Sequence, residues 1–312
     1  MLYLHSLKEG EEIFKALSTP VRLKIMELIC EDPHMSMNDL AEALQITNSA
    51  VSMHVKQLEE AGLITIHTAS GKRGIMKQIR PKYSRMIVDM DAGTGNAEKF
   101  YQDEIEIGHF SVADIHPTCG LATPSTLIGE VDNPKVFTFP DRFKAEILWF
   151  GYGSVTYTLP NRLRAGQRLT ELQISFEISS ECPEYKEDYP SDIHFILNDT
   201  ELGVWISPGD FGERRGILSP NWWPDVLNQY GLLKTLIINS AGTFMDGSLK
   251  LSNITIDDLG IDYNSNIDLT FAVPKDTPNC GGLTLFGENF GDYSQNIRMK
   301  LYYEDSDTAD KN

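Results

Sequence analysis

Residues 16–64 decide the fold of the first part of the chain. They read ALSTPVRLKIMELICEDPHMSMNDLAEALQITNSAVSMHVKQLEEAGLI. Three segments in this stretch have the composition and punctuation of short helices, and they fall at 16–29, 37–44 and 47–64. Ser18 or Thr19 can cap the first of them, because Pro20 suits the first turn of a helix. The stretch therefore predicts three consecutive short helices.

The third segment has two faces of different chemistry. Thr47 can cap this helix, and Gly62 can end it in the left-handed conformation. Val51, Val55 and Leu58 recur at helical spacing, so they lie on one face. The opposite face is polar and poor in acidic residues, and it carries Asn48, Ser49, Ser52, Met53, Lys56 and Gln57. Such a helix can pack on a small core and present its N-terminal end to the major groove of DNA.

A predicted β-hairpin follows the third helix. Residues 63–68 and 75–81 alternate as strands do, and between them lies the basic turn ASGKRG at 69–74. A helix–turn–helix followed by such a hairpin is a winged helix. We expect Lys72 and Arg73 at the tip of the hairpin to contact the DNA backbone or the minor groove.

The first 85 or so residues resemble the ArsR-type (arsenic-repressor-like) bacterial regulators. The segments that carry the resemblance are LSTPVRL at 17–23, DLA at 39–41, and SAVSMHVKQL at 49–58, which runs into EAGL at 60–63. The resemblance implies a winged-helix repressor that binds double-stranded operator DNA as a homodimer and is released by a small-molecule effector.

The charge distribution separates the two parts of the chain. The whole sequence holds 27 Lys and Arg against 45 Asp and Glu, a net charge of −18. Residues 1–90 hold 11 of each sign, so residues 91–312 carry the whole excess, whereas residues 47–90 have 7 basic and 3 acidic side chains. Phosphates repel a strongly acidic surface. We therefore expect the first part to bind DNA and the second part to do something else.

The second part of the chain is predicted to be all β. About eleven apolar runs alternate with turns rich in Gly, Pro, Asn and Asp, and no long amphipathic helix interrupts them. The runs are Phe110–Ile115, Val136–Phe139, Ala145–Phe150, Ser154–Leu159, Arg168–Ile178, Ile193–Leu197, Glu201–Ile206, Leu233–Ile238, Ser248–Ile256, Ile267–Val273 and Ile297–Tyr303. The fold class is thus multidomain α+β, a winged helix–turn–helix followed by a jelly-roll-like β-sandwich. The expected boundaries are 1–88 for the DNA-binding domain, 89–100 for a connector, 101–305 for the sandwich and 306–312 for a flexible tail.

The sequence predicts a cytoplasmic protein. The sequence has no apolar run of 18 residues and no signal peptide, so we expect no membrane partner. The cysteines Cys30, Cys119, Cys182 and Cys280 are scattered without a disulfide framework, as in a reducing compartment. We expect no cofactor.

Metal sensing, frequent among ArsR-type regulators, is not expected here. The resemblance places a metal-binding cysteine at the start of the second helix, where this sequence has DPHMSMND at 32–39 and no Cys. His34, Met35 and Met37 are soft ligands suited to Cu(I), but methionines more often pack in a core. His116 and Cys119 lack a second ligand pair at zinc spacing. We therefore expect no metal site.

The sandwich contains a segment dense in binding chemistry. Three of the four tryptophans, Trp205, Trp222 and Trp223, lie within 19 residues of one another and near carboxylates and arginines. An aromatic ring stacks on the apolar face of a sugar while planar polar groups bind its hydroxyls. The expected effector-binding residues are Glu177, Glu181, Asp210, Arg214, Trp222, Trp223 and Asn289.

Other interpretations of the second part stay open. The segments SECP at 180–183, SPGDFG at 207–212 and GDY at 291–293 are similar to those of Gram-positive regulators that join an ArsR-like head to a sandwich, in contexts that suggest carbohydrate metabolism. A sugar or polyol is thus the expected effector, although Arg214 and Arg215 would suit an anion. Alternatively, Glu177, Glu181, Asp192 and Asp210 could supply the carboxylate pair of a glycosidase, or the sandwich could serve only to oligomerise the protein. Trp222 and Trp223 could instead close the end of the sandwich.

Overall fold

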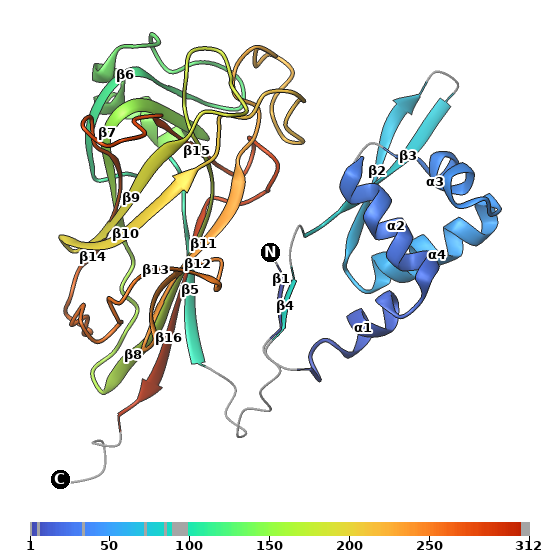
Figure 1. Ribbon diagram of the computed structural model, residues 1–312, viewed down its shortest axis with the longest axis horizontal. Coiled ribbons are helices and arrows are strands. Elements are labelled where there is room, and N and C mark those ends of the chain that lie inside the picture. The colour runs from blue at the N-terminus through green and yellow to red at the C-terminus, as the bar shows by residue number, and fades with distance from the viewer. Residues whose placement is uncertain are drawn as a thin grey trace. The chain divides into compact units, whose positions relative to one another are not determined.

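The computed structural model describes residues 2–4, 7–32, 35–71, 74–83, 86–88 and 99–306. The chain divides into two compact units, Met1–Ala97 and Glu98–Asn312 (Figure 1). The predicted connector at 89–100 spans this boundary, and its residues 89–98 lie outside the described residues, as does most of the predicted tail. Lys99 and Phe100 belong to a strand of the second unit, so the sandwich begins slightly earlier than the sequence suggested.

The described part of the first unit contains four α-helices and a β-hairpin. The helices are α1 (Glu11–Leu17), α2 (Pro20–Glu31), α3 (Met37–Leu44) and α4 (Asn48–Glu60). The antiparallel hairpin consists of β2 (Ile64–Gly71) and β3 (Gly74–Pro81), and a short parallel pair joins β1 (Leu2–Leu4) to β4 (Met86–Val88). This is the winged helix–turn–helix that the sequence predicts, with α1 added at its start.

The helices begin where the local sequence favours it. Thr19 occupies the N-cap position of α2, and Pro20 is its first residue. Ser36 and Asp39 form a capping box at α3, in which each side chain accepts a hydrogen bond from the backbone N–H of the other residue. Gly62 follows α4 with a φ of +72°, the conformation that favours glycine after a helix.

A small apolar core holds the first unit together. Its buried side chains come from all four helices and from the hairpin, and they include Ile25, Ile29, Leu40, Val51, Val55, Leu58 and Ile79. The hairpin is also fixed through its backbone, since the N–H of Ile79 donates to the carbonyl of Met35 at 3.1 Å. The wing is therefore anchored just before α3.

The described part of the second unit is built on twelve antiparallel strands. Two short 3₁₀ turns, η1 (Pro134–Thr138) and η2 (Pro140–Lys144), interrupt them. The strands are β5 (Lys99–Ile105), β6 (Val112–Ala122), β7 (Ile147–Leu159), β8 (Gln167–Ser179), β9 (Ser191–Leu197), β10 (Thr200–Ser207), β11 (Leu232–Asn239), β12 (Gly242–Met245), β13 (Leu249–Ser252), β14 (Ile267–Val273), β15 (Leu283–Phe286) and β16 (Ile297–Asp305).

Strand pairing arranges this unit as two layers. One layer has the order β6-β7-β14-β9-β10, and the other has the order β5-β16-β8-β11-β12-β13. At one side β15 pairs with both β7 and β8 and joins the layers. At the other side β10 lies against β13, where a Cβ added at Gly203 would come within 2.8 Å of Leu251. The two layers thus close on each other at both sides.

Aromatic side chains fill the space between the layers. Phe176 of β8 contacts Phe271 of β14 and Phe195 of β9, with ring centroids 4.9 and 5.6 Å apart. All three rings are fully buried. The predicted fold class is therefore confirmed, a winged helix followed by an all-β sandwich. Among the described helices, none is long and apolar enough to span a membrane.

Three strand predictions in the sandwich are wrong in detail. Val136–Phe139 is mostly the 3₁₀ turn η1, because Pro134 starts it and the side chain of Asn133 accepts the N–H of Lys135. The two runs between 145 and 159 are the single strand β7. The short strands β5, β12 and β15 were missed.

Candidate DNA-binding surface and ligand cavity

Helix α4 is oriented by its cap and by its apolar face. The Thr47 hydroxyl accepts the backbone N–H of Ala50 at 3.3 Å, which fixes the start of the helix. Val51, Val55 and Leu58 are fully buried in the core of the first unit. The remaining side of α4 must therefore face away from this core.

The polar residues predicted to contact DNA lie on that outward side. Their side chains are exposed, and they are Asn48, Ser49, Ser52, Met53, Lys56 and Gln57. Met53 is 56% exposed, which is unusual for an apolar side chain that belongs to a core. Lys56 makes only a loose ion pair with Glu60, at 3.6 Å. The N-terminal two turns of α4 are thus a compact polar surface of the kind that reads base edges.

Gln57 has a structural contact that the sequence did not reveal. The guanidinium of Arg22, which is buried, donates to the Gln57 side-chain oxygen and also to the carbonyls of Lys15 and Ala16. These bonds join the end of α1 to α4 through one side chain of α2. Arg22, the arginine in LSTPVRL, therefore stabilises the packing of α1, α2 and α4, and the side chain of Gln57 is hydrogen-bonded within the first unit.

The tip of the wing lies outside the described residues. Lys72 and Arg73 belong to it, and the strands on either side pair up to Gly71 and Gly74. The contact of these two side chains with DNA stays a prediction.

The residues considered as metal ligands are not gathered into a site in the described part of the chain. His34 lies outside it, and Met35 and Met37 pack against the core of the first unit. Among the described residues no group of three or more His, Cys, Asp or Glu side chains could hold a metal ion.

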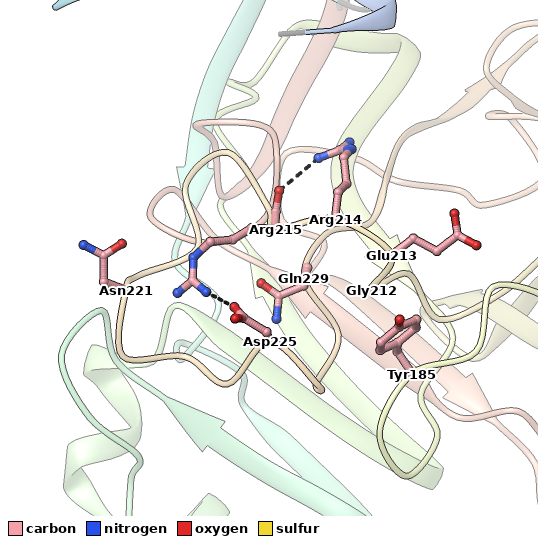
Figure 2. Close-up of a pocket in the computed structure, with 8 residues that line it drawn as sticks. All are labelled: Tyr185, Gly212, Glu213, Arg214, Arg215, Asn221, Asp225 and Gln229. Atoms are coloured by element: carbon pink, nitrogen blue, oxygen red, sulfur yellow. Dashed lines mark hydrogen bonds and ion pairs between the residues drawn. The ribbon is translucent and has the colours of Figure 1, made fainter. Parts of the chain in front are cut away.

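The second unit contains a polar cavity of about 580 Å³. Most of its wall comes from the 208–231 loop between β10 and β11, and Figure 2 shows the lining residues Tyr185, Gly212, Glu213, Arg214, Arg215, Asn221, Asp225 and Gln229. Asn221 and Tyr185 lie on opposite sides of this view, with Gln229 between them. This volume is in the range of small-molecule sites.

Both arginines of this cavity are neutralised by carboxylates. Arg214 forms a two-pronged ion pair with Asp292, and its guanidinium also lies 3.8 Å from the centroid of the Tyr230 ring. Arg215 pairs with Asp225 and donates to the carbonyl of Trp223. An incoming anion would have to displace these carboxylates, so the cavity suits a neutral polar ligand better than an anion.

Two buried polar atoms of residues in the cavity wall have no hydrogen-bond partner among the residues that the structure describes. The Gln229 side chain is only 1% exposed, and its Nε2 donates to the carbonyls of Pro224 and Leu227. Its Oε1, however, accepts no hydrogen bond, and the buried Nε of Arg215 donates none. Buried polar atoms are normally satisfied by protein, water or ligand. A hydroxyl group can donate to the oxygen and accept from the nitrogen.

Of the predicted effector residues, Glu177 is placed inside the fold. Its side chain is fully buried on β8, and its carboxylate accepts the backbone N–H groups of Gly231, Asp292 and Tyr293 at 2.7–3.1 Å. Burial raises the pKa of Glu177, and the three N–H donors oppose that shift. Glu177 therefore fixes two loops in place and is not accessible to a ligand.

Glu181 and Asp210 form a second buried acidic group. Glu181 accepts hydrogen bonds from Thr118, Asn228 and Thr284, and burial followed by the nearby charge of Asp210 raises its pKa. Asp210 accepts the N–H of Cys182 at 3.0 Å, and burial raises its pKa to about 7. Neither carboxylate lines the cavity of Figure 2.

The two adjacent tryptophans have different surroundings. Trp223 is 2% exposed, and its ring contacts Trp149 and Phe290 in a small apolar cluster that is separate from the main core of the sandwich. Trp222 is 36% exposed, and its indole N–H donates to the carbonyl of Pro124 at 2.7 Å. Trp223 is thus buried in this separate cluster, whereas Trp222 keeps part of its surface exposed.

The structure therefore brings together only part of the predicted effector set. Arg214 lines the cavity, Trp222 follows its lining residue Asn221, and Asn289 is an exposed residue that hydrogen-bonds Glu146 elsewhere. Tyr185, Asn221, Asp225 and Gln229 were not among the predicted site residues. Their signal in the sequence was weak, a polar and aromatic loop flanked by Gly and Pro, which is also typical of ordinary surface loops.

Comparisons with known proteins identify the first unit. Residues 19–65 match the family model described as winged helix-turn-helix DNA-binding. The arsenical resistance operon repressor of Bacillus subtilis (strain 168) is 40% identical over 62 residues, which cover 20% of this chain and 59% of that repressor.

Two solved structures are similar to a larger part of the chain. The carbohydrate-binding module CBM36 in complex with calcium and xylotriose shows 7% identity and a TM-score of 0.27, with 65% of this chain and 98% of that chain covered. The CBM36-1 domain of a multidomain xylanase from the hindgut metagenome of Trinervitermes trinervoides shows 8% identity and a TM-score of 0.23, with 50% and 74% covered. Both similarities are too distant to bear on the function of the sandwich. The match at the N-terminus is specific, and the first unit of the chain is a winged helix–turn–helix DNA-binding domain similar to that of the ArsR-type arsenical resistance repressor.

Proposed function

We propose that the protein is a DNA-binding transcriptional regulator, a repressor that binds operator DNA as a homodimer and whose β-sandwich senses a small neutral molecule, a sugar or polyol. The observation that carries the DNA-binding part is the outward polar face of α4, whose opposite face is buried in the core of a winged-helix domain. A helix held this way exposes the side chains at its N-terminal end to the major groove.

The test of DNA binding is selection of preferred sequences from a random duplex pool by the full-length protein. Asn48→Ala and Ser52→Ala should change the preferred bases, because these side chains face outward on the first two turns of α4. Loss of one good base contact costs about 1–3 kcal/mol of discrimination. Asn38→Ala, at an exposed position of α3, is the matched control and should leave the preference unchanged. If both α4 variants preferred the same bases as the wild type, the proposal that α4 contacts the bases would be wrong.

The sensing part of the proposal is supported by the cavity of the 208–231 loop. Its arginines are paired with carboxylates, and its wall exposes the polar side chains of Tyr185 and Asn221, which can hydrogen-bond hydroxyl groups. A sugar or polyol presents several such hydroxyls and no charge. The acidic character of residues 91–312 also disfavours anionic effectors.

The glycosidase alternative draws no support from its four candidate carboxylates. Glu177, Glu181, Asp192 and Asp210 are buried, and each accepts hydrogen bonds from its own protein. Asp192, for example, accepts from Thr277 and Asn279. A catalytic pair must instead flank a bound substrate.

The test of sensing is titration calorimetry of the full-length protein with a panel of sugars and polyols. Asn221→Ala should weaken binding of the sugar that responds, by roughly tenfold or less for one exposed hydrogen bond. Asn264→Ala, an exposed asparagine remote in sequence and not part of the cavity wall, is the matched control. If no member of the panel binds, the sandwich is not a sugar sensor.

A further inference from the structure

A second cavity of about 530 Å³ lies in the same unit. Its wall is formed by the 123–129 segment, which follows β6, together with Phe139, Asp141 and Lys144. Nothing in the sequence pattern marked this segment as a binding region.

Trp222 links this second cavity to the first. Its chain neighbour Asn221 lines the first cavity, and its indole N–H donates to the carbonyl of Pro124, which lines the second, at 2.7 Å. The ring of Trp222 meets Trp223 edge-on, with centroids 5.6 Å apart and an interplanar angle of 86°. Because Trp223 is buried, its contact fixes the position of the Trp222 ring, and 36% of the Trp222 side chain is still exposed.

The chemistry of the second cavity matches that of the first. Hydroxyl groups come from Thr123, Ser125 and Thr126, and apolar surface comes from Leu127 and Phe139, each 40% exposed. Asp141 and Lys144 neutralise each other in an ion pair of 3.0 Å. In both cavities the basic side chains are thus paired with carboxylates, each wall contains hydrogen-bonding groups, and the exposed ring of Trp222 is linked to both walls.

We propose that the ligand of the sandwich is a linear neutral oligosaccharide, of at least two or three sugar units, that fills both cavities and crosses Trp222. This inference rests on the proposed sensing function of the same unit. A single sugar would reach the contacts of one cavity only. A chain would stack one ring on Trp222 and place its neighbours against the exposed lining residues of the first cavity on one side and Phe139 on the other.

The experiment compares chain lengths within several series, using titration calorimetry of the full-length protein. The probes are glucose, maltose and maltotriose; glucose, cellobiose and cellotriose; and xylose, xylobiose and xylotriose. In at least one series the affinity should rise by about tenfold or more from the monosaccharide to the trisaccharide. Trp222→Ala should remove most of that increase.

Variants of the second cavity separate the two sites. Phe139→Ala and Leu127→Ala should lower the affinity for the trisaccharide more than the affinity for the monosaccharide. Phe143→Ala removes a neighbouring ring that is 49% exposed and does not line the cavity, so it is the matched control. Intact melting temperatures of the variants show that they fold.

Three outcomes would overturn the inference. Equal affinity for mono- and trisaccharide in every series would exclude an extended ligand while leaving the proposed sensing function in place. An equal loss of both affinities in Phe139→Ala and Leu127→Ala would show that the second cavity is not a separate subsite. Absence of binding to every probe would remove both the inference and the sugar-sensing proposal.

Discussion

Among single residues, Asp210 is a buried carboxylate whose pKa lies within the range of ordinary experiments. Its side chain is fully buried, one carboxylate oxygen accepts from Cys182, and the other has no protein partner. Desolvation is the main reason that its pKa is raised to about 7. An Asp with an ordinary pKa near 3.8 in the unfolded chain thus binds a proton more tightly when the protein is folded.

Asp210 should make the stability of the protein fall as pH rises. Below about pH 4, Asp210 is protonated in both the folded and the unfolded state, and its contribution to stability is fully present. As the pH rises from there through about 7, the unfolded chain ionises first, so the free energy of unfolding falls by up to about 1.4 kcal/mol per pH unit. Asp210→Asn cannot ionise, so melting temperatures measured from pH 5 to 8 should decline less steeply in this variant than in the wild type. Asp188→Asn, at an exposed position, is the control. Parallel curves for wild type and Asp210→Asn would show that Asp210 does not titrate in this range.

The roles of single residues were predictable only where their partners are close in sequence. Thr47, Val51 and Leu58 act within one helix, and the structure places them as the sequence indicates. Glu177 reaches its donors at Gly231 and Tyr293, and Arg22 reaches Gln57, through contacts that only the folded chain creates. A buried carboxylate and a ligand-binding carboxylate look alike in a sequence, so Glu177, Glu181 and Asp210 could not be assigned.

Among the elements, the hairpin β2–β3 is the part of the head whose function depends on charge. The basic residues 47–90 hold 7 Lys and Arg against 3 Asp and Glu, and the turn between β2 and β3 contains Lys72 and Arg73. A hairpin fixed to the head at Met35 can hold these side chains against a duplex. Contacts of this kind to phosphates add affinity without reading sequence.

The double variant Lys72→Ala with Arg73→Ala should weaken binding to all DNA sequences alike. Each lost phosphate contact should reduce the slope of log affinity against log salt by about 0.9. The measurement is fluorescence anisotropy of labelled duplexes between 50 and 200 mM salt, roughly the range over which such contacts are most visible. Lys15→Ala with Lys24→Ala removes the same charge from α1 and α2 and is the control. An unchanged slope in the wing variant would contradict docking through the wing.

Elements with a strong local signal were predicted well, and those that depend on pairing were not. The alternation of residues 64–81 gives the hairpin directly. The strand β15 has only four residues, Leu283–Phe286, and it exists because β7 and β8 pair with it on both sides. In contrast, Val136–Phe139 has the composition of a strand, but Pro134 and Pro140 start 3₁₀ turns in this region.

In the molecule as a whole, the winged-helix domain and the sandwich are two separate compact units, and our proposal assigns DNA binding to the first and ligand binding to the second. The first unit holds 11 Lys and Arg against 12 Asp and Glu, whereas the second holds 16 against 33, so the charge pattern favours DNA binding by the first. A sensor needs a free energy of coupling between the two sites, and about 1–3 kcal/mol, or roughly 5- to 150-fold in affinity, is sufficient.

Ligand binding should therefore change the DNA affinity of the full-length protein by a factor in that range, downward for a repressor that its effector releases. The check is anisotropy with a selected duplex in the presence and absence of the sugar that binds. Asn221→Ala should shift the response to higher sugar concentration without altering DNA affinity in the absence of sugar, because Asn221 belongs to the second unit. A sugar that binds tightly and leaves DNA affinity unchanged would favour the oligomerising role of the sandwich.

The hydrogen bond between Arg22 and Gln57 limits the number of base pairs that one protomer can contact through α4. With Gln57 committed to the fold, direct reading falls to the outward residues from Asn48 to Lys56, a length of about 12 Å at roughly 1.5 Å per helical residue. Base pairs stacked about 3.4 Å apart place only three or four of them within this length. A sequence of three or four base pairs recurs throughout any genome. If α4 reads DNA as we propose, one winged-helix domain cannot specify a single promoter, and selectivity would increase when two protomers each contact such a site at a fixed separation.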